Sequence, residues 1–124
     1  MCIRDRYTCT SERSTVFQKE QQSVKRVVEY IDTHFDQPVS LQMLAECAGY
    51  SSAHLCRKFK SLCGVSPMQY LNHIRCENAS RMLCDSGLSV TEACFTAGFN
   101  DPNYFSKVFK KIYGKSPRAF KKSL

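Results

Sequence analysis

Hydrophobic residues recur at helical spacing along most of the chain, and no segment shows the sustained alternation of a β-strand. In the first amphipathic segment the apolar residues fall at i, i+3, i+4, i+7 and i+11: Val24, Val27, Val28, Ile31 and Phe35. Ser23 is expected to be the N-cap of this helix, and Pro38 to end the segment. The pattern over the whole chain predicts an all-α protein of about seven helices.

Two shorter helices follow, each ending at a glycine. The first of them starts after Ser40 and stops at Gly49, and the second ends at Gly64. Their apolar positions are Leu41, Leu44, Ala45 and Ala48 in one, and Leu55, Phe59 and Leu62 in the other. A longer helix then begins with Pro67 and ends near Gly87.

The longer helix is about 18 residues, or roughly 27 Å, in length. Its apolar residues form two separate groups: Tyr70, Leu71 and Ile74 in the first half, and Ala79, Met82 and Leu83 in the second. Because the two groups do not share one stripe, we expect a connecting helix that packs against different neighbours at its two ends.

After this helix the earlier pattern returns, which indicates an internal duplication. Ser89 and Glu92 have the spacing of a capping box at the start of the repeat. Val90, Ala93, Cys94, Ala97 and Gly98 take the places of Leu41, Leu44, Ala45, Ala48 and Gly49, and Phe105, Phe109 and Ile112 take those of Leu55, Phe59 and Leu62. The offset is 49 residues up to Phe99 and 50 residues afterwards.

Each repeat reads as a short helix, a glycine-containing turn and a second helix, which is the helix-turn-helix layout. Since the apolar residues occupy one face of the second helix, the opposite face should point outward. That face shows Ala53, Cys56, Arg57 and Lys60 in the first repeat, and Asn103, Ser106, Lys107 and Lys110 in the second. Such a stripe suits a DNA major groove, where Arg pairs with guanine and Asn with adenine. Lys60, Lys110 and Lys111 are better placed for phosphates.

The connecting helix supports the same interpretation. Two recognition helices read successive major grooves when they lie about 34 Å apart. A helix of roughly 27 Å plus the packing at its ends gives a spacing of that order. A helix that opens at Asp101 and Pro102, as N-cap and N1, would then expose its lysines and bury its aromatics.

The charge distribution also favours a polyanionic partner. The net charge is +7, and no Asp or Glu follows Asp101. Seven cations do follow it: Lys107, Lys110, Lys111, Lys115, Arg118, Lys121 and Lys122. This one-sided excess is typical of nucleic-acid binding, although a solvated surface would show it too. No apolar run is long enough to span a bilayer, so we expect no membrane partner and a cytoplasmic location.

The chain has eight cysteines but no CxxC pair. We therefore expect reduced thiols, with Cys47, Cys84 and Cys94 as small core residues, and neither zinc nor another cofactor. Cys56 near His54, or His73 near Cys76, could suggest a thiol nucleophile. The chain shows no glycine-rich loop or strand-borne nucleophile to complete such a site, so an enzyme is not expected, and His54 is read as a capping or packing residue.

Two stretches carry a family resemblance: "SLQMLAECAGYSSAHLCRKFKSLCGVSPMQYL" and "SVTEACFTAGFNDPNYFSKVFKKIYGKSPRAF". The second contains Y-F-x-x-x-F-K-K followed by G-x-S-P-x-x-F. The chain resembles the DNA-binding region of the AraC/XylS family of bacterial transcription regulators. That family implies seven helices, with two helix-turn-helix subdomains joined by a long central helix. Its base-reading positions fall on Ala53, Cys56, Arg57, Asn103, Ser106 and Lys107.

The resemblance also implies partners and boundaries. It implies double-stranded DNA, RNA polymerase, more often activation than repression, and an effector that acts through a separate N-terminal domain. Residues 1–6, "MCIRDR", match a translated sequencing adapter and are expected to be an artefact. Residues 7–21 would be a linker and 22–122 the DNA-binding domain, divided into subdomains 22–66 and 88–122 around a linker helix 67–87.

One other use of the basic helices stays open, and a second is not expected. A protein-interaction module could present them to an acidic partner without reading DNA sequence. A membrane-surface helix is not expected, because the large apolar residues of 105–112 are needed for the core.

Overall fold

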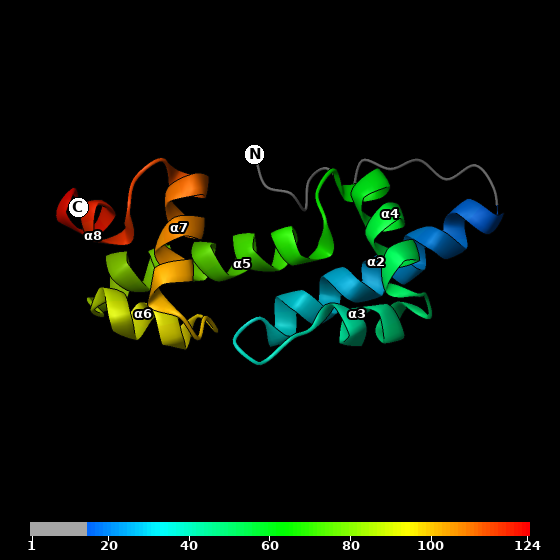
Figure 1. The fold of residues 1–124 in the computed structure, drawn as a ribbon, viewed down its shortest axis with the longest axis horizontal. Helices are drawn as coiled ribbons and strands as arrows, with labels where there is room; N and C mark the ends of the chain where they lie inside the picture. The colour runs from blue at the N-terminus through cyan, green and yellow to red at the C-terminus, as the bar shows by residue number, and fades with distance from the viewer. Residues whose placement is uncertain (1–14) are drawn as a thin grey trace. The chain divides into compact units, whose positions relative to one another are not determined.

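The computed structural model describes residues 15–124, with side chains from residue 21 onward except that of Ser86. Within that range the chain is helical and has no strand, which confirms the predicted all-α class (Figure 1). The elements are α2 (Thr15–His34), α3 (Leu41–Ala48), α4 (Ser52–Cys63), α5 (Pro67–Arg81), the π-helical turn η1 (Met82–Ser86), α6 (Val90–Thr96), α7 (Pro102–Tyr113) and α8 (Pro117–Lys122).

The helices form two compact units, and α5 contributes residues to both. The first unit holds α2, α3, α4 and the start of α5 as far as Leu71. The second unit holds the rest of α5 from Asn72, the helices that follow, and the loop 35–38. Of the two groups of apolar residues predicted along the connecting helix, Tyr70 and Leu71 belong to the first unit, while Ile74 falls in the second unit with the later group.

The predicted start of the first helix is wrong. α2 begins at Thr15, so Ser23 lies inside it and is not its N-cap. The segment 15–22 contains no Gly or Pro and is rich in Gln, Lys and Glu. Such residues extend an existing helix at little cost, because the nucleus has already been formed. The expected linker, 7–21, overlaps the first turns of α2, while its remainder and residues 1–6 lie outside the described residues.

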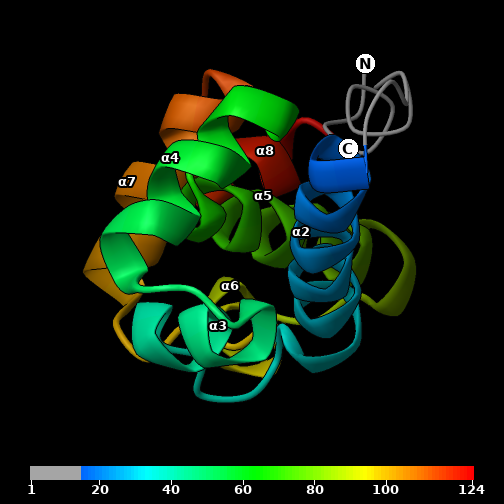
Figure 2. The ribbon, with the colours of Figure 1, turned by 90° about the vertical axis from the view of Figure 1, so that its right-hand side faces the viewer.

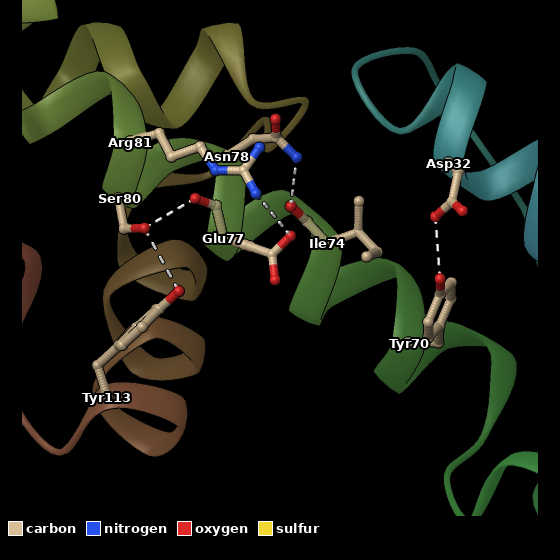
Figure 3. A network of polar contacts seen from close by, with 8 residues as sticks. All are labelled: Asp32, Tyr70, Ile74, Glu77, Asn78, Ser80, Arg81 and Tyr113. Carbon is tan, nitrogen blue, oxygen red and sulfur yellow. Dashed lines mark hydrogen bonds and ion pairs between the residues drawn. The ribbon is translucent and has the colours of Figure 1, made fainter. Parts of the chain in front are cut away.

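In the first unit α3 and α4 pack against α2 and against each other (Figures 1 and 2). The predicted stripe of α2 is buried at Val24, Val27 and Ile31. Tyr70 is fully buried and donates its hydroxyl proton to Asp32 Oδ1 at 2.9 Å (Figure 3). This bond satisfies the polar end of the largest side chain in the core.

The second unit has its own core, built from residues of α5, η1, α6 and α7 together with Ala97 and Phe99. Its buried members are Cys76, Ala79, Leu83, Ala93, Cys94, Ala97, Phe99, Phe105 and Phe109. At its edge Tyr113 donates to Ser80 Oγ at 3.4 Å, and Ser80 donates to the Glu77 carbonyl at 2.7 Å (Figure 3). The predicted capping box is confirmed, and its hydrogen bonds with Ser89 lower the pKa of Glu92.

The duplication is visible in the backbone hydrogen bonds. Gly49 N–H donates to Glu46 O and Gly98 N–H to Phe95 O, both at 3.1 Å. The next residues repeat the match, with Tyr50 N–H bonded to Ala45 O at 2.9 Å and Phe99 N–H to Cys94 O at 3.1 Å. After the turn, Gly64 and Gly114 each donate at 2.8 Å, to the carbonyls of Lys60 and Lys110. The two units therefore share one backbone design.

Two side chains differ from the expectations. Tyr104 is about half exposed, so the aromatics of the second turn and helix are not all core residues. It directly precedes buried Phe105 and so lies about 100° from the apolar stripe. Cys84 is exposed, whereas Cys94 is buried and Cys47 is partly buried. Cys84 lies in η1, where the wider π turn changes the register that α5 had set.

Gly98 lies where two segments of the second unit approach closely. Its φ of 105° is unfavourable for residues with a side chain. A Cβ atom here would collide with the backbone of Phe35 and Asp36. The same loop is held by Arg75, whose Nε donates to Phe35 O at 2.7 Å and whose Nη2 donates to Gln37 O at 3.0 Å. Burial lowers the pKa of the Arg75 guanidinium.

We expect Gly98→Ala to destabilise the chain by about 2–4 kcal/mol, because it adds both backbone strain and overlap with backbone atoms. Gly114→Ala is the matched control: its φ is 81°, but no atom lies within 4 Å of the added Cβ. It should cost only about 1 kcal/mol of strain. Urea unfolding of the two variants measures the free energy of unfolding of each. An equal decrease in both would show that the close approach at Gly98 does not contribute to stability.

Candidate nucleic-acid interface

The orientation of α4 is set by its caps and by its buried face. Ser51 Oγ accepts the His54 N–H, and the helix ends at Gly64 in the left-handed conformation. Leu55 and Phe59 are fully buried, so the opposite side of the helix faces outward. On that side Ala53, Arg57 and Lys60 are exposed and Cys56 is half-buried.

α7 repeats this arrangement in the second unit. Asp101 caps it by accepting the Asn103 N–H, and Pro102 occupies the first turn, as predicted. Phe105 and Phe109 are fully buried. The outward side has Asn103, Lys107 and Lys110 exposed and Ser106 half-buried, which is the same order of exposure as along α4. The structure thus brings each group of three predicted base-reading residues onto one accessible helix face.

The charged groups on these faces are available to a ligand. Within residues 21–124, neither Arg57 nor Lys107 makes an ion pair or a side-chain hydrogen bond. Lys111 is exposed in the last turn of α7. Other cations of the basic tail are engaged: Lys121 Nζ donates to Leu88 O at 2.8 Å, and Lys115 Nζ to Ser123 Oγ at 3.5 Å. The tail is therefore partly structural, whereas Lys107, Lys110 and Lys111 of α7 make no side-chain hydrogen bond or ion pair within residues 21–124.

Sequence reasoning missed an aromatic contact near the start of α4 and another near the start of α7. The His54 ring stacks on Tyr50, with 4.2 Å between ring centroids, which confirms the expected packing role of His54. In the second unit Tyr104 contacts Phe99, with centroids 6.2 Å apart. Asn72 Nδ2 also donates to the Tyr104 hydroxyl at 2.8 Å. The repeat offset of 50 residues, which relates His54 to Tyr104, was the available signal.

Two buried cysteines, Cys63 and Cys76, lack the environment of a nucleophile. Cys76, the partner considered for His73, is fully buried, and its burial raises the thiol pKa to about 12. Burial also raises the pKa of Cys63 to about 12. A thiol with such a pKa carries almost no thiolate near neutral pH. In residues 15–124, no helix has the length and apolar character needed to cross a membrane.

Comparison with known proteins agrees with this geometry. The family described as a helix-turn-helix domain matches residues 44–123. The chain is 34% identical over 98 residues to the HTH-type transcriptional activator RhaS of Escherichia fergusonii. The matched region covers 79% of this chain and 35% of that protein. The chain spans about a third of the length of this relative.

Two solved structures share the fold. The DNA-binding domain of AdpA, a global transcriptional factor determined in complex with a target DNA, is 31% identical with a TM-score of 0.76. The match covers 81% of this chain and 90% of that one. A probable AraC family transcriptional regulator from Rhodopseudomonas palustris is 26% identical with a TM-score of 0.74, covering 82% of this chain and 96% of that one.

The fold and the two exposed stripes define a tandem helix-turn-helix domain of the DNA-binding class. Within that class, the chain belongs to the AraC/XylS family and corresponds to its DNA-binding domain.

The burial of the thiols predicts their reactivity. At pH 8 we expect iodoacetamide to modify exposed Cys84 at least tenfold faster than Cys76, because Cys76 is inaccessible and has a pKa of about 12. Peptide mass spectrometry of the native chain measures both rates, and urea-unfolded chain provides the control in which the difference disappears. Rapid labelling of Cys76 in the native chain would contradict the buried environment.

Proposed function

We propose that this chain binds double-stranded DNA sequence-specifically in transcription regulation, with α4 and α7 inserted in adjacent major grooves. The observation that carries the proposal is the pair of matched stripes, each presented opposite a fully buried aromatic or leucine face. Family membership and the DNA complex of AdpA support it. An acidic protein partner would need basic surface, but it would not need two stripes with the same order of exposure.

Each side chain has a role that its chemistry allows. Arg57 can bond O6 and N7 of guanine together, and Asn103 can bond N6 and N7 of adenine. Ser106 and Lys107 add hydrogen bonds on the second helix. Ala53 and Cys56 are weak hydrogen-bonding residues, so the first helix would discriminate through Arg57 and through apolar contact with thymine methyl groups. Lys60, Lys110 and Lys111 would bind phosphates.

The wider role follows from the family. RhaS is named a transcriptional activator, and on that likeness we extend the proposal to activation of transcription with RNA polymerase as a protein partner. An effector would act through a separate domain of the whole protein. No residue of this chain is assigned to either role.

In vitro selection of duplex DNA with the 124-residue chain tests the central proposal. We expect an enriched motif with two half-sites about one helical turn apart. Arg57→Ala and Lys107→Ala should each weaken binding by about 1–3 kcal/mol and relax preference at one base position. One enriched half-site would restrict base reading to one unit. Salt-sensitive binding without enrichment would instead favour a basic module that does not read sequence.

The phosphate contacts have a separate measure. Lys111→Ala and Lys60→Ala should weaken binding to all duplexes alike, because a phosphate carries no sequence information. Each should also reduce the slope of log K against log salt by about 0.9, the effect of one released counterion. Lys25→Ala, on the exposed side of α2, is the control with an unchanged slope. If the salt slope of Lys111→Ala equals that of the wild type, Lys111 does not bind a phosphate.

A further inference from the structure

Tyr104 is an exposed aromatic residue within a helix that buries its other large rings. Its side chain is 49% exposed, whereas neighbouring Phe105 and Phe109 are 0% exposed. The ring is held on one side by Phe99. The side chain is therefore accessible and also fixed in place, which lowers the entropy lost when it binds a ligand.

The direction of the hydrogen bond between Asn72 and Tyr104 determines whether the Tyr104 hydroxyl can donate to another group. Asn72 Nδ2 donates to the Tyr104 oxygen at 2.8 Å. An amide nitrogen only donates, so the hydroxyl is the acceptor in this bond and keeps its own proton for another group. Within residues 21–124 Asn72 is the one hydrogen-bond partner of the Tyr104 side chain. The free proton thus needs an acceptor from solvent or from a ligand.

The position on α7 indicates which acceptor. Tyr104 follows Asn103 directly and shares a flank of the helix with Lys107 and Lys111, at i+3 and i+7. Both lysines are exposed, so the local field favours an anion. The first unit has an equivalent group, because His54 is the third residue of α4, as Tyr104 is of α7, and its ring stacks on Tyr50.

We propose that Tyr104 donates a hydrogen bond from its hydroxyl to a DNA phosphate beside the groove that α7 enters, and that Asn72 is the positioning residue that keeps this proton outward. Tyrosine hydroxyls are among the groups that bind the DNA backbone and fix the register of a protein on the duplex. The inference rests on the proposed DNA-binding function and adds a neutral backbone contact to the lysines.

Tyr104→Phe tests the contact, because it removes the hydroxyl and retains the ring. We expect affinity for the selected duplex to fall about tenfold, as for a hydrogen bond to a charged acceptor. The base preference and the salt slope should not change, because no charge is lost. Tyr113→Phe is the matched control on the same helix: its hydroxyl bonds Ser80 inside the unit, so DNA affinity should stay at the wild-type value.

Duplexes with a single neutral methylphosphonate locate the phosphate. In the wild type, one methylphosphonate should weaken binding because it removes the phosphate that Tyr104 contacts. In Tyr104→Phe the same methylphosphonate should cause no further loss of affinity. Asn72→Ala should weaken binding in the wild type but not in the Tyr104→Phe background, since its effect passes through the hydroxyl. A merely structural loss would not erase sensitivity at one phosphate.

The possible failures are distinct. If wild type enriches a sequence but Tyr104→Phe binds it equally well, the phosphate contact is wrong and the proposed function stands. The same holds if every methylphosphonate costs the variant as much as it costs the wild type. If wild type binds no duplex in a salt-sensitive way, both proposals are wrong.

Discussion

The burial of one face of each recognition helix is the constraint from which the remaining surface follows. Leu55 and Phe59 in α4, and Phe105 and Phe109 in α7, are fully buried. Each such side chain contributes about 1.5–3 kcal/mol relative to exposure. Rotation of either helix about its axis would expose them, so the helix orientation is fixed. The stripe on the opposite side is then rigid, which is what a surface that reads a groove requires.

The turns keep the two units alike despite different side chains. The glycines that end α3, α4 and α7 are left-handed, and the backbone hydrogen bonds around the turns correspond pair by pair. Because the design is in the backbone, the exposed positions are free to differ. Ala53 and Cys56 stand where the second unit has Asn103 and Ser106. Under the proposed function, two copies of one scaffold would read two different half-sites.

The accuracy of the sequence predictions followed the range of the interactions involved. Both ends of α3 and the start of α7 were predicted correctly, because Ser40, Gly49 and Asp101 act within one helical turn. The start of α2 was wrong, because a serine inside a continuous helix has the same local appearance as a cap. The exposure of Cys84 was missed, because the π turn that changes the register has no pattern that periodicity detects. The site residues proved to share exposed faces, and their contact with bases stays a prediction.

The sequence by itself determined the helices, the duplication and the outward stripes, because a 3.6-residue period separates buried from exposed positions without reference to the rest of the chain. The tertiary structure decided what those patterns leave open: the hydrogen bond from Asn72 to Tyr104, and the bonds from Arg75 to the loop at Phe35 and Gln37. These pairs are 32 to 40 residues apart in the chain. Only the packing of α5 against its neighbours brings them within hydrogen-bond distance, and no local period encodes that approach.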